Sequence, residues 1–170
     1  MNLCVFQGTF NPIHNAHIRM AEFVLENYNV DKILFIPAYK PPHKEFDPKC
    51  AQHRLNMVKL AAEDNPRFEV SDIEFRNKEV SYTYNTIKKL KAQYDKIYFI
   101  IGADAYEKID TWYNAAQLKE LVEFIVFPRS ADDISSSKVR EKIQKNEPIE
   151  DLIPKKVWYY IQSHGLYKCQ

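Results

Sequence analysis

The sequence predicts a doubly wound α/β fold: a parallel, Rossmann-like sheet with flanking helices and a short C-terminal helical segment. Short β-rich runs alternate along the chain with segments whose apolar residues recur at helical spacing. The β-rich runs are apolar almost throughout, as expected of parallel strands that are covered on both faces. Polar segments follow several of these runs, at the edge of the sheet where such folds bind ligands.

Five runs are expected to form the strands of the sheet. They are mostly apolar and lack the polar alternation of a half-exposed strand. Because helical patterns separate them, neighbouring strands are expected to be parallel. Their bounds are Leu3–Phe6, Ile33–Pro37, Phe68–Ile73, Ile97–Ile101 and Phe124–Phe127.

Four helices are expected between these strands. Apolar residues three and four positions apart mark their inner faces, such as Leu55, Val58 and Ala62 in the second helix. The four helices lie near Ala16–Asn27, Ala51–Glu63, Tyr82–Tyr94 and Asn114–Leu121.

Two further helices are expected near the end of the sequence. The hydroxyls of Ser135–Ser137 should cap a helix that runs to about Lys145. Pro154 should open the other helix, and Gly165 should end it.

Length and composition favour one domain, residues 1–170, with a formal net charge of only +1. Such a charge creates no overall field for nucleic acid or an anionic membrane. The cysteines Cys4, Cys50 and Cys169 show no CxxC spacing, and Cys4 should be a small core residue of a strand. No secretory signal and no apolar run of the ~20 residues that a membrane span needs is evident. We therefore expect a cytoplasmic protein with neither nucleic-acid nor membrane partners.

The segment QGTFNPIHNAH, Gln7–His17, is the clearest candidate site. Gly8 permits a sharp turn or a close approach to a ligand, and Pro12 stiffens the loop. His14 and His17 stand at the start of a predicted helix, whose unpaired N–H groups favour anions, so the segment predicts a phosphate site. The alternative is that both histidines are capping and surface residues. A metal site is disfavoured, because zinc-binding pairs on one helix are usually four residues apart and no third ligand is near in the sequence.

Other polar segments should converge on the same edge of the sheet. Pro41–Lys44 follows the second strand, Gly102–Asp104 follows the fourth, and Arg129 and Ser135–Arg140 follow the fifth. The sequence contains neither GxxxxGK[ST] nor GxGxxG. Their absence argues against P-loop NTPases and standard dinucleotide oxidoreductases.

Several motifs together resemble those of a known family. GTFNPIHNAH is similar to the GTFxPxHxxH motif of the nucleotidyltransferase superfamily. PPHK, SYTYNT, GADAYEKIDTWY and ISSSKVR follow in the order typical of bacterial nicotinate-nucleotide adenylyltransferases, and the ending LIPKKVWYYIQSHGLY is also similar. The resemblance therefore covers nearly the whole sequence.

The sequence also departs from the family pattern. Gln7 stands where glycine is common, Asn11 where aspartate is usual and Ala16 where the HxGH motif has glycine. Ser137 replaces threonine. The segment from Phe127 to Ile134 is much shorter than in typical members, which affects the expected ATP pocket and oligomer contacts.

The resemblance implies that ATP is joined to nicotinate mononucleotide, with release of pyrophosphate and formation of deamido-NAD. The nucleophile would be the phosphate of the mononucleotide, which is already ionised at neutral pH, so no general base is needed. Catalysis would consist of holding the α-phosphate in line and neutralising charge on the departing pyrophosphate. Mg²⁺ is expected to accompany ATP, with no dedicated protein site for the metal.

The resemblance also implies roles for particular residues. His17 would donate to the α-phosphate, His14 and Arg140 would hold the ATP phosphates, and Lys44 would contact phosphate, so these four form the expected catalytic set. The expected ATP-binding residues are Gly8, Thr9, Phe10, His14, His17, Gly102, Asp104, Ser135, Ser136, Ser137 and Arg140.

The mononucleotide is expected to contact Lys44, Thr83, Asp104, Trp112 and Tyr113. Asp104 would bind a pair of ribose hydroxyls, and Trp112 would stack on the pyridine ring. The hydroxyl of Thr83 and the backbone N–H of Tyr113 would meet the carboxylate. Without the resemblance, Lys44 would be interpreted as a solvated lysine, Asp104 as a helix cap and Trp112 as a core residue. Tyr82 and Trp158 are expected to be packing residues.

Other interpretations remain open at the level of sequence. Nicotinamide mononucleotide is the nearest alternative substrate, and phosphopantetheine is a more distant one. A catalytically inactive relative that senses nucleotides is also consistent with the changes at Gln7, Asn11 and Ala16. A homo-oligomer is compatible with the sequence but is not required by it.

Overall fold

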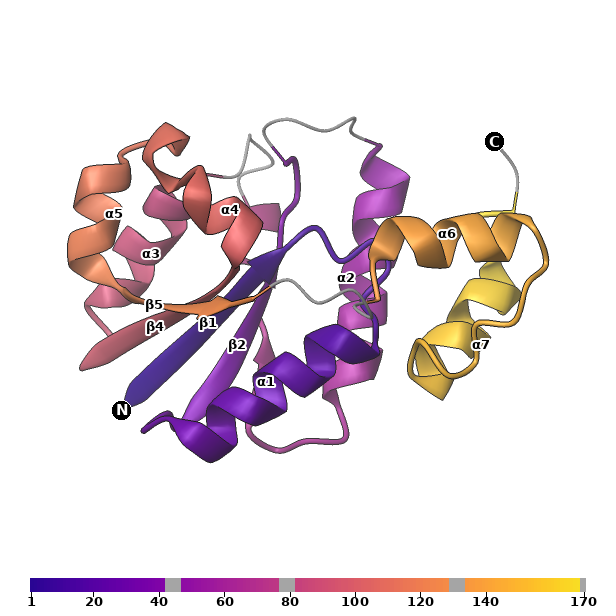
Figure 1. The fold of residues 1–170 in the computed structure, drawn as a ribbon, viewed down its shortest axis with the longest axis horizontal. Helices are drawn as coiled ribbons and strands as arrows, with labels where there is room; N and C mark the ends of the chain where they lie inside the picture. The colour runs from indigo at the N-terminus through magenta and orange to yellow at the C-terminus, as the bar shows by residue number, and fades with distance from the viewer. Residues whose placement is uncertain (42–46, 77–81, 129–133, 169–170) are drawn as a thin grey trace.

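The computed structural model describes residues 1–41, 47–76, 82–128 and 134–168. Its centre is a parallel sheet with strand order β3-β2-β1-β4-β5 (Figure 1). The strands are β1 (Asn2–Gly8), β2 (Lys32–Pro37), β3 (Phe68–Val70), β4 (Lys96–Gly102) and β5 (Glu123–Phe127). The direction of strand order reverses beside β1, which pairs with both β2 and β4. The predicted doubly wound α/β fold is confirmed, and its switch point lies between β1 and β4.

The third strand is shorter than predicted. The sequence suggested a strand to Ile73, but β3 ends at Val70 and Ile73 begins the short 3₁₀ helix η1 (Ile73–Phe75). The Ser71 hydroxyl accepts a hydrogen bond from the Ile73 N–H at 3.1 Å. This local turn competes with extension of the strand, so the sequence pattern placed its end too late.

The six predicted helices are present, with shifts at their ends. The third helix, expected from Tyr82 to Tyr94, is confined to Thr83–Lys91. Two short elements were not predicted: α4 (Ala103–Glu107) and the 3₁₀ helix η2 (Ile109–Thr111). The longer helices are α1 (Asn15–Asn27), α2 (Pro48–Ala62), α3 (Thr83–Lys91), α5 (Ala115–Leu121), α6 (Ser136–Gln144) and α7 (Lys155–His164).

The predicted ends of the two C-terminal helices are confirmed. Ser135 is the N-cap of α6, and its hydroxyl accepts from the Lys138 N–H at 3.1 Å. Pro154 precedes α7, and Gly165 ends it with φ of 61°, a conformation that favours glycine. Neither these helices nor any other helix in the described ranges is long and apolar enough to cross a membrane.

The two faces of the sheet bury separate hydrophobic cores. Alternate residues of β1 divide between them: Cys4 and Phe6 face one core, and Leu3 and Val5 face the other. The first core is completed by α1, α2, α6 and α7, and the second by α3, α5 and η2. In Figure 1, α6 and α7 lie beside α2, on the opposite side of the sheet from α3 and α5. Because both faces are covered, the middle residues of β1, β2 and β4 are apolar, and Cys4 is a buried core residue as predicted.

A buried arginine joins the loops that follow β1 and β2. Arg54 of α2 is only 4% exposed. One guanidinium nitrogen donates to the carbonyl oxygens of Thr9 at 2.8 Å and Ala38 at 2.7 Å, and the other donates to that of Tyr39 at 3.1 Å. The planar fork of donors is suited to several carbonyls at once. Arg54 therefore fixes the relative position of two loops at the carboxyl edge of the sheet.

We expect Arg54→Met to lower the free energy of unfolding by about 2–4 kcal/mol, because buried carbonyl groups would lose their charged donor. Urea unfolding monitored by circular dichroism measures the loss. Arg54→Lys should recover only part of the stability, since one ammonium cannot reproduce the fork. Arg19→Met, at an exposed position of α1, is the matched control and should change stability by no more than about 0.5 kcal/mol. A loss at Arg54 no larger than that of the control would contradict the role given to this side chain.

Candidate active site

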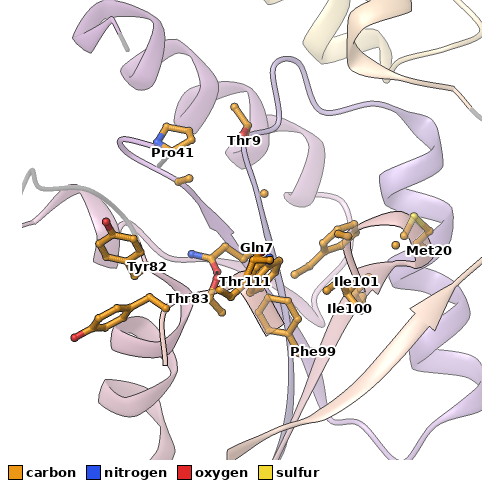
Figure 2. Close-up of a pocket in the computed structure, with 17 residues that line it drawn as sticks. Gln7, Thr9, Met20, Pro41, Tyr82, Thr83, Phe99, Ile100, Ile101 and Thr111 are labelled. Atoms are coloured by element: carbon orange, nitrogen blue, oxygen red, sulfur yellow. The ribbon is translucent and has the colours of Figure 1, made fainter. Parts of the chain in front are cut away.

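A pocket of about 740 Å³ opens at the carboxyl ends of β1 and β4 (Figure 2). This is the switch point of the sheet, where ligands of open α/β folds bind. Its wall combines residues of both strands with the loops and short helices that follow them: Phe6, Gln7, Gly8, Thr9, Met20, Ala38, Pro41, Tyr82, Thr83, Phe99, Ile100, Ile101, Gly102, Ala105, Thr111, Trp112 and Tyr113.

Six of the residues predicted to bind substrates line this pocket. They come from segments far apart in the sequence: Gly8, Thr9, Thr83, Gly102, Trp112 and Tyr113. Trp112 is partly buried, and its ring packs edge-on against Phe99 with centroids 6.2 Å apart. The Tyr113 side chain is 51% exposed at the rim. Gly8, Thr9 and Gly102 follow strand ends, as the predicted convergence requires, whereas Thr83, Trp112 and Tyr113 were expected from the family resemblance.

One of the two packing predictions is wrong. Tyr82 is 39% exposed and lines the pocket, where its ring lies 5.0 Å from that of Tyr113. It directly precedes the first residue of α3, so the chain enters the helix at the pocket wall instead of beneath it. Trp158 is packed against the first core, as predicted.

The loop between β1 and α1 folds back over the end of β1. Phe10 has φ of 51° and is buried, with its ring edge-on to those of Phe6 and His17. A Cβ on Gly8 would come within 3.2 Å of the Phe10 ring, so glycine permits this close approach. Because its side chain is buried in the loop, Phe10 can offer a ligand its backbone more readily than its ring.

The two histidines form a stacked pair at the start of α1. Their ring centroids lie 3.6 Å apart, and His14 is the N-cap of the helix. The backbone N–H of His14 donates to Nδ1 of His17 at 3.1 Å. Burial first, and the neighbouring His14 second, hold the pKa of His17 well below its ordinary value. His17 is therefore neutral at pH 7, and since Nδ1 accepts, its ring proton is on Nε2.

The start of α6 lies against the same loop. The Ser136 hydroxyl donates to the Pro12 carbonyl at 2.8 Å. Arg140 donates from one terminal nitrogen to the Asn11 carbonyl at 2.7 Å and from the other to the Ser137 hydroxyl at 3.3 Å. These contacts bring a guanidinium and an N-terminal helix turn to the histidine loop. None of Ser135–Ser137, Arg140, His14 or His17 lines the pocket itself, so the predicted phosphate-binding groups form a neighbouring cluster.

The structure describes Asp104 but not Lys44. Asp104 is exposed in the first turn of α4, next to pocket residues Gly102 and Ala105. The N-cap of α4 is Gly102, so the alternative in which Asp104 caps the helix is not what the structure contains. Lys44 lies outside the described residues, as does Arg129, and the short segment from Phe127 to Ile134 is only partly within them.

A series of hydrogen-bonded polar side chains beneath the pocket was not predicted from the sequence. The Thr83 hydroxyl donates to Oε1 of Gln7 at 2.6 Å, and Nε2 of Gln7 donates to Oε2 of Glu74. The Thr86 hydroxyl donates to the same Glu74 oxygen at 2.7 Å. In the sequence, Gln7 stands out only as a departure from a motif, and no spacing pattern links it to Glu74.

Arg54 was detectable in principle, because it shares the inner helical face of Ala51, Leu55 and Val58.

The comparisons with known proteins agree with the fold. Residues 5–142 match the model of the cytidylyltransferase-like family. A protein of Caldicellulosiruptor saccharolyticus named as a probable nicotinate-nucleotide adenylyltransferase is 38% identical over 195 aligned positions, which cover 99% of this chain and all of the relative. The Bacillus subtilis nicotinate-nucleotide adenylyltransferase is 38% identical, with 96% of this chain and 97% of the relative covered.

Solved structures support the same fold. The Plasmodium falciparum nicotinic acid mononucleotide adenylyltransferase in complex with NaAD superposes with a TM-score of 0.76 at 22% identity, covering 99% of this chain and 98% of the other. At this identity the likeness establishes the architecture alone, whereas the full-length sequence relatives establish the family. The chain therefore belongs to the nicotinate-nucleotide adenylyltransferases of the cytidylyltransferase-like family.

Proposed function

We propose that this chain transfers the adenylyl group of ATP to nicotinate mononucleotide, giving nicotinate adenine dinucleotide and pyrophosphate in the cytoplasmic synthesis of NAD. The observation that carries the proposal is that three features, a histidine pair, an arginine and a pocket, lie at one loop. The histidine pair of α1 and Arg140 of α6 both contact the loop that follows β1, and the aromatic-lined pocket begins at the same strand end.

The histidine loop is suited to a phosphoryl group that gains charge. Neutral His17 would donate its Nε2 proton to an α-phosphate oxygen, because Nδ1 already accepts from the backbone. Arg140 would hold the ATP phosphates together with His14, as a permanent cation is suited to do. Ser135, Ser136 and Ser137 would add donors at the start of α6.

The incoming phosphate of the mononucleotide is itself the nucleophile, so this site needs no general base. The protein would orient the two substrates and stabilise the leaving pyrophosphate. Mg²⁺ would enter with ATP and neutralise charge on its phosphates. In the described ranges, no cluster of three or more histidine, cysteine or carboxylate side chains could hold a metal of its own.

The pocket would hold the nucleosides. Trp112 would stack on the pyridine ring, and the backbone N–H of Tyr113 would donate to its substituent. Gly8, Thr9, Phe10 and Gly102 would present backbone to ATP. Asp104 would bind ribose hydroxyls, and Lys44 would contact phosphate.

Two of the three substitutions that suggested an inactive sensor, Gln7 and Asn11, are accommodated structurally. Asn11 accepts a hydrogen bond from the Tyr167 hydroxyl at 2.5 Å, and Gln7 is held between Glu74 and Thr83. Neither residue displaces the histidine pair or Arg140. These contacts favour an enzyme over a binding module.

The direct test is turnover of the purified chain with ATP, Mg²⁺ and each acceptor in turn. We expect nicotinate mononucleotide to give dinucleotide and equimolar pyrophosphate, resolved by chromatography. Nucleotide binding without any dinucleotide would support the sensor instead. If phosphopantetheine is the only acceptor that is converted, the proposed acceptor is rejected.

We expect His17→Ala to reduce kcat by ~10²–10³, since one preorganised donor to developing charge would be lost. Steady-state kinetics with both substrates saturating measure the effect. The matched control is His164→Ala, at an exposed histidine that ends α7, which should leave kcat unchanged. A near-normal kcat for His17→Ala would leave His17 with only a capping role.

We expect Arg140→Ala to weaken ATP binding by about 10–100-fold, in keeping with the loss of a charged hydrogen bond. Binding of the mononucleotide should change much less, because Arg140 lies with the histidine loop and not in the pocket wall. Separate calorimetric titrations of the two substrates compare the effects. Lys142→Ala, on the same helix, serves as the control, and equal weakening of both substrates by Arg140→Ala would show that the subsites are assigned wrongly.

A further inference from the structure

Buried Glu74 organises the polar chain beneath the pocket. Its side chain in η1 is 4% exposed, and one of its oxygens, Oε2, accepts hydrogen bonds from both the Thr86 hydroxyl and the Gln7 amide. An oxygen that accepts from two donors has no proton to offer Gln7. The Gln7 amide must therefore direct its NH₂ group toward Glu74.

This orientation determines where the Thr83 proton points. With its NH₂ group on Glu74, Gln7 presents its carbonyl oxygen to Thr83, whose hydroxyl donates to it at 2.6 Å. A threonine hydroxyl has one proton and two lone pairs. Once the proton is on Gln7, Thr83 can only accept a further hydrogen bond from a group in the pocket. Figure 2 shows Gln7 and Thr83 side by side on the pocket wall.

The direction of the Thr83 hydrogen bond matters because the two candidate mononucleotides differ in the substituent on the pyridine ring. A pyridine carboxylate only accepts hydrogen bonds, whereas a carboxamide also has an NH₂ group that donates. Thr83 as an acceptor complements the carboxamide NH₂ and opposes a carboxylate oxygen. The expectation that the Thr83 hydroxyl meets the carboxylate is therefore wrong for this structure, because its proton is used by Gln7. The backbone N–H of Tyr113, on the same pocket wall, can donate to either substrate.

A second effect acts in the opposite direction. Thr83 is the first residue of α3, and the positive end of a helix dipole favours a negative carboxylate. The acid is therefore still favoured by charge, while the hydroxyl of Thr83 favours the amide. The balance between the two sets the selectivity of the pocket.

We propose that the Glu74–Gln7–Thr83 chain is a specificity-determining relay that weakens discrimination between nicotinate and nicotinamide mononucleotides. Gln7 is a positioning residue, because it acts through the Thr83 hydroxyl. The inference rests on the proposed adenylyl transfer and refines its substrate class. Without the Gln7 side chain, Thr83 regains a free proton for the carboxylate, and selectivity for the acid increases.

The test measures kcat/KM for both mononucleotides in the unmodified chain and in Gln7→Ala and Gln7→Met. The acid-to-amide ratio should increase at least about tenfold in both variants, the factor that corresponds to one hydrogen-bond mismatch. Met approximates the volume of Gln without its polar atoms. The ratio is internal to each preparation, so partial unfolding of a variant cancels from it.

A double-mutant cycle separates the relay from a general change in packing. In a Thr83→Val background, Gln7→Met should alter the ratio by less than about twofold, because the hydroxyl through which it acts is absent. Gln52→Ala, at an exposed glutamine of α2, is the matched control and should leave the ratio unchanged. An unchanged ratio in the Gln7 variants, or an increase that persists without the Thr83 hydroxyl, overturns the relay.

Failure of the proposed function gives a different result. If the unmodified chain converts neither mononucleotide, adenylyl transfer is rejected. The dissociation constants of the two mononucleotides, measured by calorimetry in the same variants, then decide the relay separately. If the acid-to-amide ratio of the dissociation constants is the same with and without the Gln7 side chain, the relay is rejected as well.

Discussion

The hydrogen bonds of Arg54 are the constraint on which the geometry of the site depends. The loops after β1 and β2 leave the sheet from neighbouring strands, and their first carbonyl groups lie beyond the last residues of those strands. A single guanidinium reaches from α2 to Thr9, Ala38 and Tyr39 and satisfies carbonyls of both loops. Burying that charge is tolerated only where hydrogen bonds to the guanidinium compensate for its lost hydration, as these three do. The same requirement keeps Thr9 and Ala38 at fixed positions on the pocket wall.

Around this fixed point, the site divides into two parts with different physical character. The pocket is lined mainly by apolar and aromatic side chains, which suits the flat rings of nucleosides. The neighbouring histidine loop holds two imidazoles, serine hydroxyls and one guanidinium, which suit phosphates. The positive charge is local, in a chain whose formal net charge is only +1. Substrate selection in such a protein depends on close contacts more than on long-range attraction.

The sequence predicted the fold well because its main signals are local. Strands covered on both faces are apolar throughout, and helix ends are marked by residues such as Ser135 and Gly165, so both could be recognised from composition and spacing. The convergence of Gly8 and Gly102 followed from the rule that parallel strands end at one edge, whereas Thr83 was expected only from the family resemblance. What could not be predicted depends on pairs distant in sequence. Gln7 and Glu74 are 67 residues apart, and nothing in the sequence around either residue indicates their contact.

The contacts of the first loop also bear on the order of folding. The segment from Asn11 to Asn15 is held by Ser136, Arg140, the carbonyl of Leu152 and the hydroxyl of Tyr167. All of these partners are more than 120 residues away, with the separation from Tyr167 reaching 156. Contacts of such high sequence separation form late, because a long loop must close first. A ribosome-bound chain can therefore form α1 early, but it acquires an ordered histidine loop only when α6 and α7 have been synthesised.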